Sequence, residues 1–171
     1  MKASWPVIIF FSFFLVPCFG DLIDDACHKT SDFNLCATSL RSDPHSSSAD
    51  LKGLTRIMIQ LGLAKANQIS AQVKLLLNQS KDRGFKQCLQ ICLEEFGYAI
   101  DPRLPDAIKY LNSNDYWNVD TNLVGAGNSA ETCEESFTEP PGYTSPLAEV
   151  DKNFDHFIEV TRDLLSQLKQ K

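Results

Sequence analysis

Apolar residues recur every three or four positions in four long stretches of this 171-residue sequence. These stretches cover residues 51–79, 82–112, 116–139 and 146–168. The spacing places apolar side chains on one face of a helix, whereas a half-buried strand needs strict alternation, which no long run shows. The clearest stripe consists of Val150, Phe154, Phe157, Ile158, Thr161, Leu164, Leu165 and Leu168. Four amphipathic helices with short connections predict an all-α, up-down-up-down four-helix bundle.

Capping residues, prolines and glycines mark the ends and breaks of these predicted helices. Asp50 follows a serine-rich turn and is placed to cap the first long helix. Residues 102–105 contain two prolines and interrupt the second helix, because proline removes a backbone donor and crowds the preceding turn. We expect Gly125 and Gly127 to loosen the third helix. We expect residues 145–146, Ser-Pro, to open the last one.

The first twenty residues have the pattern of a secretory signal peptide. Lys2 supplies a positive start, residues 7–16 are almost wholly apolar, and Gly20 ends the stretch with a small residue. A membrane anchor is the alternative, but the apolar run has about 10 residues where a span needs roughly 20. We therefore predict a signal peptide at 1–20, a single mature domain at 21–171, and no membrane attachment after cleavage.

Five cysteines follow the predicted cleavage point: Cys27, Cys36, Cys88, Cys92 and Cys133. Thiols tend to pair in an oxidising compartment. Thr-Ser-Asp lies midway between the first two, which predicts two short helices folded into a disulfide-stapled hairpin at the N-terminus. Cys92 and Cys133 both lie on inward helical stripes, so a bridge between them would tie two helices together. Cys88 has nearly the same phase as Cys92, and it could exchange roles, remain a buried thiol or pair between molecules.

Charge and histidine spacing argue against several classes of partner. Lys and Arg number 16 against 22 Asp and Glu, which gives a net charge of -6. Nucleic acids and anionic lipids both require a basic surface, so we expect neither as a partner. No Cys-x-x-Cys pair is present, and His28, His45 and His156 follow no ligand spacing. We therefore predict no metal and no cofactor.

Catalytic patterns are also missing from the sequence. The acidic pairs 24–25, 94–95 and 134–135 are adjacent residues, which point about 100° apart on a helix, so we interpret them as solvated faces. No Gly-x-Ser-x-Gly run and no glycine-rich phosphate loop occurs. Cys88 lies on an apolar stripe that favours the protonated thiol. We predict that this chain is not an enzyme.

Several segments together resemble one plant protein family. The mature start D-D-A-C-H-K-T-S-D-F-N-L-C is followed by C-L-E-E-F-G-Y-A-I from Cys92, C-E-E-S-F from Cys133, and Ser145-Pro146-Leu147. These segments resemble the invertase and pectin methylesterase inhibitors and follow that family's order over residues 21–171. The resemblance implies a four-helix bundle with an N-terminal helical hairpin and disulfides Cys27–Cys36 and Cys92–Cys133. Cys88 is an additional thiol that the four-cysteine pattern does not explain.

The resemblance also implies a function. Members of this superfamily block a cell-wall or vacuolar enzyme by covering its active-site cleft. The N-terminal likeness favours acid invertase (β-fructofuranosidase) as the target, with pectin methylesterase as the alternative. We expect a monomer that binds this protein target in the apoplast and cell wall, or in the vacuole. A secreted helical carrier of a small apolar ligand is a more remote alternative, since eleven phenylalanines could line a bundle.

Residues 115–118 are the candidate target-binding site. In invertase inhibitors that the chain resembles, a Pro-Lys-Phe tripeptide before the third bundle helix enters the invertase active site. This sequence has Asp115, Tyr116, Trp117 and Asn118 there, so the aspartate matches and the tripeptide does not. The two aromatic residues either pack the start of the helix or form an exposed anchor for the target.

One further surface feature is a glycosylation sequon. Asn78-Gln79-Ser80 is an N-glycosylation acceptor sequence in a chain predicted to be exported, so Asn78 is a candidate glycan site.

Overall fold

The computed structural model describes residues 21–170, and the predicted signal peptide lies outside the described residues. The helical elements in chain order are α1 (Leu22–Cys27), α2 (Phe33–Arg41), η1 (Pro44–Ser48), α3 (Leu51–Gln79), α4 (Arg83–Tyr98), η2 (Ala99–Arg103), α5 (Leu104–Asn112), α6 (Tyr116–Thr138) and α7 (Ala148–Lys169). Within residues 21–170 no strand occurs. The all-α prediction is confirmed.

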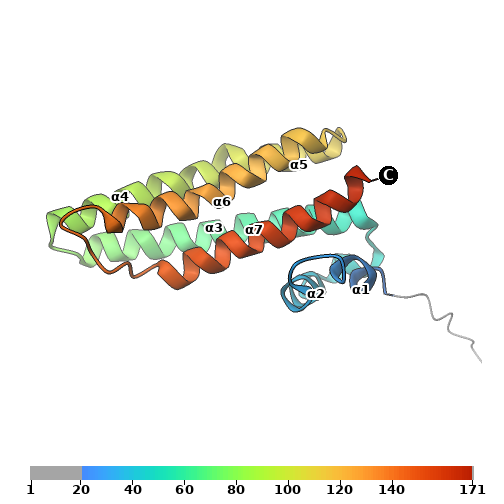
Figure 1. Ribbon diagram of the computed structural model, residues 1–171, viewed down its shortest axis with the longest axis horizontal. Helices are drawn as coiled ribbons and strands as arrows, with labels where there is room; N and C mark the ends of the chain where they lie inside the picture. Colours follow the sequence, from blue (N-terminus) through green and yellow to red (C-terminus); the bar gives the residue numbers. More distant parts are fainter. Residues whose placement is uncertain (1–20, 171) are drawn as a thin grey trace, which may run out of the picture.

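Four rods form the bundle. In Figure 1, α3, the α4–α5 rod, α6 and α7 lie alongside one another, with α4, α5 and α6 above α3 and α7. Successive rods run in opposite directions, which confirms the up-down-up-down topology. The hairpin of α1 and α2 lies beneath the end of the bundle where α3 begins and α7 ends.

Aspartate side chains cap the N-termini of α2, α3, α4 and α6, as they also do for α1 and η1. Asp50 accepts a hydrogen bond from Gly53 N at 2.7 Å, and Asp82 accepts one from Phe85 N at 2.7 Å. Asp32 and Asp115 cap α2 and α6 in the same way. Each carboxylate satisfies a backbone N–H that has no partner within its helix. The cap predicted at Asp50 is therefore present.

The second rod bends where the sequence predicts an interruption. Asp101 has φ −151° and ψ 118°, an extended conformation inside an otherwise helical path. Pro102 follows it, and the residue before a proline is pushed out of the helical region. The helix resumes at Leu104 and continues as α5. The bend thus separates α4 from α5 without removing either from the bundle.

Two apolar clusters form the core. The larger one joins the four rods and includes Phe96 of α4 against Phe154 of α7, with ring centroids 5.4 Å apart. The smaller one packs Leu40 of the hairpin with Met58 of α3 and Leu164 of α7. The N-terminal hairpin therefore packs against α3 and α7 at one end of the bundle, where it buries its own apolar residues.

Both disulfides that the resemblance implies are present. Cys27 pairs with Cys36 at a Cα–Cα distance of 5.5 Å, and Cys92 pairs with Cys133 at 4.4 Å. Cys88 is a free thiol with 7% of its surface exposed. Its Sγ donates to the carbonyl oxygen of Ser136 at 3.1 Å. Of the three alternatives for Cys88, the structure has the buried thiol.

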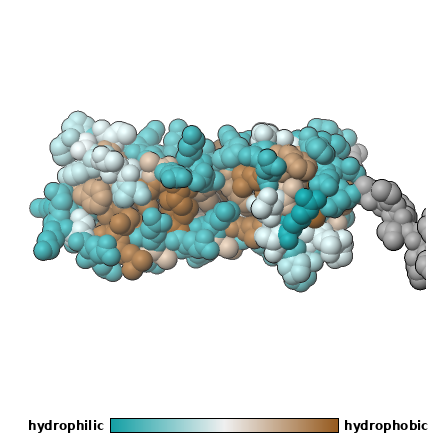
Figure 2. Space-filling model, turned by 90° about the horizontal axis from the view of Figure 1, so that it is seen from below, coloured by the Kyte–Doolittle hydropathy of each residue, from teal (hydrophilic) through white to brown (hydrophobic). Residues whose placement is uncertain are grey.

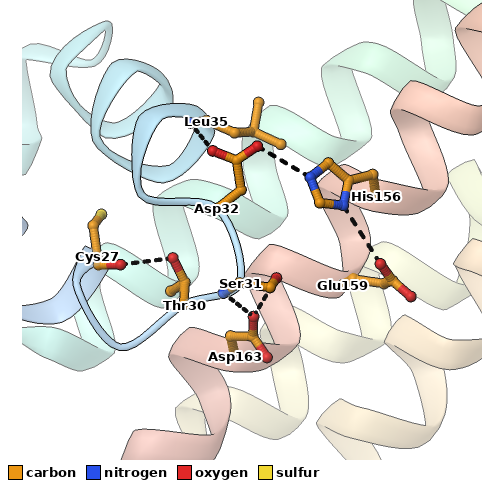
Figure 3. Close-up of polar contacts among 8 residues, drawn as sticks. All are labelled: Cys27, Thr30, Ser31, Asp32, Leu35, His156, Glu159 and Asp163. Carbon is orange, nitrogen blue, oxygen red and sulfur yellow. Dashed lines mark hydrogen bonds and ion pairs between the residues drawn. The ribbon is translucent and has the colours of Figure 1, made fainter.

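A polar contact attaches the hairpin to α7 (Figure 3). The backbone N and the hydroxyl of Ser31 both donate to one carboxylate oxygen of Asp163 at 2.7 Å. His156 lies between two carboxylates, with Nε2 3.2 Å from Asp32 Oδ2 and Nδ1 3.5 Å from Glu159 Oε2. We call these five residues the hairpin latch. It joins segments more than 120 residues apart in sequence.

Two local expectations differ from the structure. The third helix continues unbroken through Gly125 and Gly127. Arg103 lies so close to Gly125 that a Cβ there would meet its guanidinium, so this glycine permits close packing between rods and not flexibility. The last helix begins at Ala148, later than the predicted Ser145, because the Ser145 hydroxyl accepts from Leu147 N and forms a turn ahead of the helix.

Candidate target-binding site

The turn between α5 and α6 has a fixed backbone. Asn114 adopts φ 59°, a left-handed conformation that asparagine tolerates better than most residues, and its N–H bonds to Leu111 O at 3.1 Å. Asp115 then caps α6, because one carboxylate oxygen accepts from Asn118 N at 3.2 Å. The other accepts from the Asn118 side-chain amide at 2.6 Å. Asp115 and Asn118 therefore hold one another in place.

Tyr116 and Trp117 occupy different environments on this turn. Tyr116 is partly buried against the bundle core, and its hydroxyl lies 3.3 Å from Asn114 Oδ1. Trp117 has 77% of its surface exposed, the largest exposed fraction among the large apolar side chains of residues 21–170. The packing interpretation therefore holds for Tyr116, and Trp117 has the exposure that the anchor interpretation requires. Sequence pattern alone does not separate these two neighbours.

Two cations from α3 lie against the same turn, and the sequence does not indicate them. Lys52 Nζ donates to Asn112 O at 3.1 Å and to Asn114 Oδ1 at 2.7 Å. Arg56 donates to Asn112 Oδ1 at 2.6 Å. These residues are about 60 positions from the turn in sequence, so only the bundle topology brings them together. The candidate site thus combines an exposed indole with a rigid turn and nearby positive charge.

Glu134 differs from its interpretation as part of a solvated acidic pair. It is half-buried and its carboxylate lies beside the buried carboxylate of Asp151 on α7. Together with Cys133 Sγ, these oxygens lie within 4.8 Å of one another. Because that sulfur is bonded to Cys92, it cannot act as a thiolate ligand. Sequence pattern could not predict this cluster, because it depends on the packing of α6 against α7.

The histidine and serine of the hairpin latch do not form a nucleophile and its base. Ser31 Oγ donates to Asp163, while His156 contacts Asp32 and Glu159 (Figure 3). A serine nucleophile needs the base within hydrogen-bond reach of its hydroxyl. The contacts of His156 with Asp32 and Glu159 raise the pKa of the histidine, and the hydrogen bond with Asp32 is the larger cause. The latch is thus a structural ion-pair cluster.

The fold and this site together indicate a class of protein. The chain is a disulfide-stapled helical bundle whose interior is filled by protein side chains, among them Phe96, Phe137, Phe154 and Phe157. The turn before α6 carries an exposed aromatic residue, Trp117. These are features of a binding protein that acts through its surface.

Comparison with known proteins identifies the family. A sequence model of the plant invertase/pectin methylesterase inhibitor family matches residues 21–166. The chain is 36% identical over 139 residues to a pectinesterase inhibitor of Actinidia deliciosa, covering 81% of this chain and 75% of the relative. It is 29% identical over 143 residues to the cell wall/vacuolar inhibitor of fructosidase 1 of Arabidopsis thaliana, covering 84% and 67%.

A solved structure agrees on the fold. The crystal structure of a pectin methylesterase inhibitor from Arabidopsis thaliana superposes with a TM-score of 0.63 and 20% identity, covering 85% of this chain and 95% of that one. The chain therefore belongs to the plant invertase/pectin methylesterase inhibitor family, and it is a proteinaceous enzyme inhibitor, not an enzyme.

Two remaining features are the sequon at Asn78 and the apolar length of the helices. Asn78 is exposed near the C-terminal end of α3, where a glycan would have room. Among the helices of residues 21–170, none is long and apolar enough to cross a membrane.

Proposed function

We propose that this protein is a secreted inhibitor of pectin methylesterase. The observation that carries the proposal is the start of α6, where Trp117 is 77% exposed and residues 115–118 contain no lysine. An invertase uses paired carboxylates in its active site, and a lysine of the inhibitor would complement them. The higher identity to the Actinidia deliciosa pectinesterase inhibitor, 36% against 29% for the fructosidase inhibitor, supports the same target.

The proposed contact surface is the α5–α6 turn with Trp117 at its centre. A tryptophan that is exposed in the free protein and desolvated in a complex is the residue type most enriched among binding hot spots. The cap at Asp115 and the contacts of Lys52 and Arg56 hold the turn in one conformation before binding. Less conformational entropy is then lost on association. Tyr116 supports this surface from the core side.

The direct test is inhibition of purified pectin methylesterase and, separately, of purified acid invertase. The proposal predicts stoichiometric inhibition of the first enzyme at concentrations that leave the second active. Inhibition of invertase alone would contradict it. The proposed secretion is tested by N-terminal sequencing of the exported protein, which is expected to begin at Asp21. Glycosidase treatment is expected to reduce the mass if Asn78 carries the proposed glycan.

Trp117→Ala tests the contact surface. We expect at least about 30-fold weaker binding to the target enzyme, the loss corresponding to a hot spot of about 2 kcal/mol. Leu75→Ala is the matched control, because Leu75 is 62% exposed but lies on the last turns of α3, at the opposite end of the bundle. Full inhibition by a folded Trp117→Ala variant would exclude the indole as an anchor.

Acid invertase is the second candidate, favoured by one observation. Lys52 lies at the same turn, so a cation is available beside residues 115–118 although none occurs within them. If the target is invertase, Lys52→Met is expected to weaken its inhibition while leaving the fold intact.

A further inference from the structure

Asp151 is a buried carboxylate without a hydrogen-bond donor. It lies on the first turns of α7 with 1% of its surface exposed. Neither of its carboxylate oxygens has a hydrogen-bond partner among the described residues. Burying an ionised carboxylate in this way is costly, so such a group either takes up a proton or finds a cation.

The group that faces Asp151 is another carboxylate. Glu134 projects from α6, and its Oε1 accepts a hydrogen bond from Ser145 Oγ at 2.5 Å. That hydroxyl oxygen in turn accepts from Leu147 N at 3.1 Å. Glu134 therefore contacts both the connection that leads into α7 and the buried acid on α7. Burial, followed by the neighbouring Glu134, raises the pKa of Asp151 to about 8.

The other charged groups nearby do not supply a compensating positive charge. Glu131 of α6 and Lys152 and Asp155 of α7 line the same surface cavity of about 310 Å³. Besides Asp151, the cavity is therefore lined by three carboxylates and one lysine: Glu131, Glu134, Asp155 and Lys152. Burial and two neighbouring glutamates also raise the pKa of Asp155. On the α4 side, the disulfide of Cys92 with Cys133 adjoins this cluster, and a disulfide does not titrate.

We propose that Asp151 of α7 and Glu134 of α6 share one proton, and we call this pair the acid clasp. At acidic pH the clasp holds the connection between α6 and α7 in place, and it opens as the pH rises. In the closed form the protonated Asp151 donates a hydrogen bond to the Glu134 carboxylate. When the pH rises, the proton is released to solvent and two negative charges face each other between α6 and α7. Their repulsion and their burial favour the open form. The clasp is a property of the bundle and does not depend on which enzyme is the target.

The direction of the pH effect follows from proton linkage. Between about pH 4, where an unfolded aspartate ionises, and about pH 8, the folded chain holds one proton that the unfolded chain has released. Stability is therefore lost as the pH rises through this range. Asp151 alone contributes up to a tenfold fall in the folding equilibrium constant for each pH unit.

Asp151→Asn tests the clasp. Asparagine keeps the shape of the side chain, and its amide offers a hydrogen-bond donor to Glu134 at every pH. Because the amide does not titrate, the variant lacks the proton that the clasp shares. We expect wild type and variant to have similar stability near pH 4, with the variant becoming progressively more stable toward pH 8. The measurement is urea denaturation at pH 4, 5, 6, 7 and 8. Hydrogen exchange of residues 139–151 is expected to accelerate with pH, beyond its intrinsic rate, in wild type and not in the variant.

A second variant and a control keep the test decisive. Glu134→Gln gives Asp151 a neutral donor and is expected to flatten the pH profile even if Asp151→Asn folds poorly. Glu149→Gln removes an exposed carboxylate two residues away and is expected to leave the profile unchanged. Parallel profiles for wild type and both clasp variants would overturn the proposal. So would calcium chloride stabilising wild type at pH 7 while leaving Asp151→Asn unaffected, because that result indicates a cation site.

Discussion

At the residue scale, the part of the hairpin latch that contains His156 depends on the protonation of that histidine. His156 Nε2 lies 3.2 Å from Asp32 Oδ2, and the ring is 40% exposed. Asp32 also caps α2, and its pKa is lowered, first by the backbone N–H of Leu35 and then by His156. A contact at this exposure is screened by water and contributes little to stability. Its interest lies in its pH dependence and not in its strength.

His156→Gln is expected to lower the melting temperature by about 1–2 °C at pH 5.5 and to leave it unchanged at pH 8.5. The pKa of His156 is raised above its ordinary value of 6.5, so the ion pair is fully present below 6.5 and disappears as the pH rises through the raised pKa. Thermal unfolding at both pH values is the measurement.

Asp163→Ala is the companion variant for this prediction. Its contact with Ser31 requires no histidine charge, so its loss should be similar at the two pH values. Equal losses for His156→Gln at pH 5.5 and 8.5 would show that the histidine acts through packing alone.

At the element scale, the sequence predicts what depends on neighbouring residues in the chain. The cap at Asp50, the break near Pro102 and the four apolar stripes follow from local rules and are present in the structure. The start of α7 and the continuity of α6 at Gly125 were not predictable in this way. Each depends on a contact made after folding, with the turn hydroxyl of Ser145 and with Arg103 of the neighbouring rod.

The same distinction between local pattern and contacts made after folding applies to the candidate site. Sequence pattern selects residues 115–118 but assigns Tyr116 and Trp117 equal roles. Only the packing of α6 buries one and exposes the other. Asp151 escaped prediction for the same reason, since it lies within an ordinary amphipathic stretch and its partner comes from another helix.

Two glycines have no close neighbours, and replacing each with alanine is expected to change the stability in opposite directions. Gly97 lies in α4 and Gly142 follows the prolines after α6, and an added Cβ would meet nothing within 4 Å at either position. Gly97→Ala should stabilise the protein by about 1 kcal/mol, because alanine is the better helix former. Gly142→Ala should destabilise it by about 1 kcal/mol, because its φ of 76° is left-handed.

Urea denaturation of the two variants checks this pair, and each serves as the control for the other. A shift of the same sign in both variants would mean that backbone conformation does not decide the effect. Steric contact cannot account for either shift, because an added Cβ meets nothing within 4 Å at Gly97 or at Gly142.

At the scale of the whole molecule, each apolar cluster has its own disulfide. Cys27–Cys36 closes a short loop within the hairpin cluster, with a sequence separation of 9. Cys92–Cys133 joins two rods of the main cluster across a separation of 41. Because a cross-link stabilises mainly by restricting the unfolded chain, the longer loop should contribute more. The two bridges should also protect different parts of the molecule.

The double variant Cys92→Ala/Cys133→Ala is therefore expected to lose about 3.9 kcal/mol, and Cys27→Ala/Cys36→Ala about 2.7 kcal/mol, on the loop-entropy relation. Urea denaturation measures both losses. Hydrogen exchange should locate the second loss in residues 22–41, while the first should raise exchange throughout the four rods. Larger destabilisation from the hairpin variant would contradict the loop-length argument. It would mean that the hairpin, folded against α3 and α7, stabilises the bundle more than the link between α4 and α6 does.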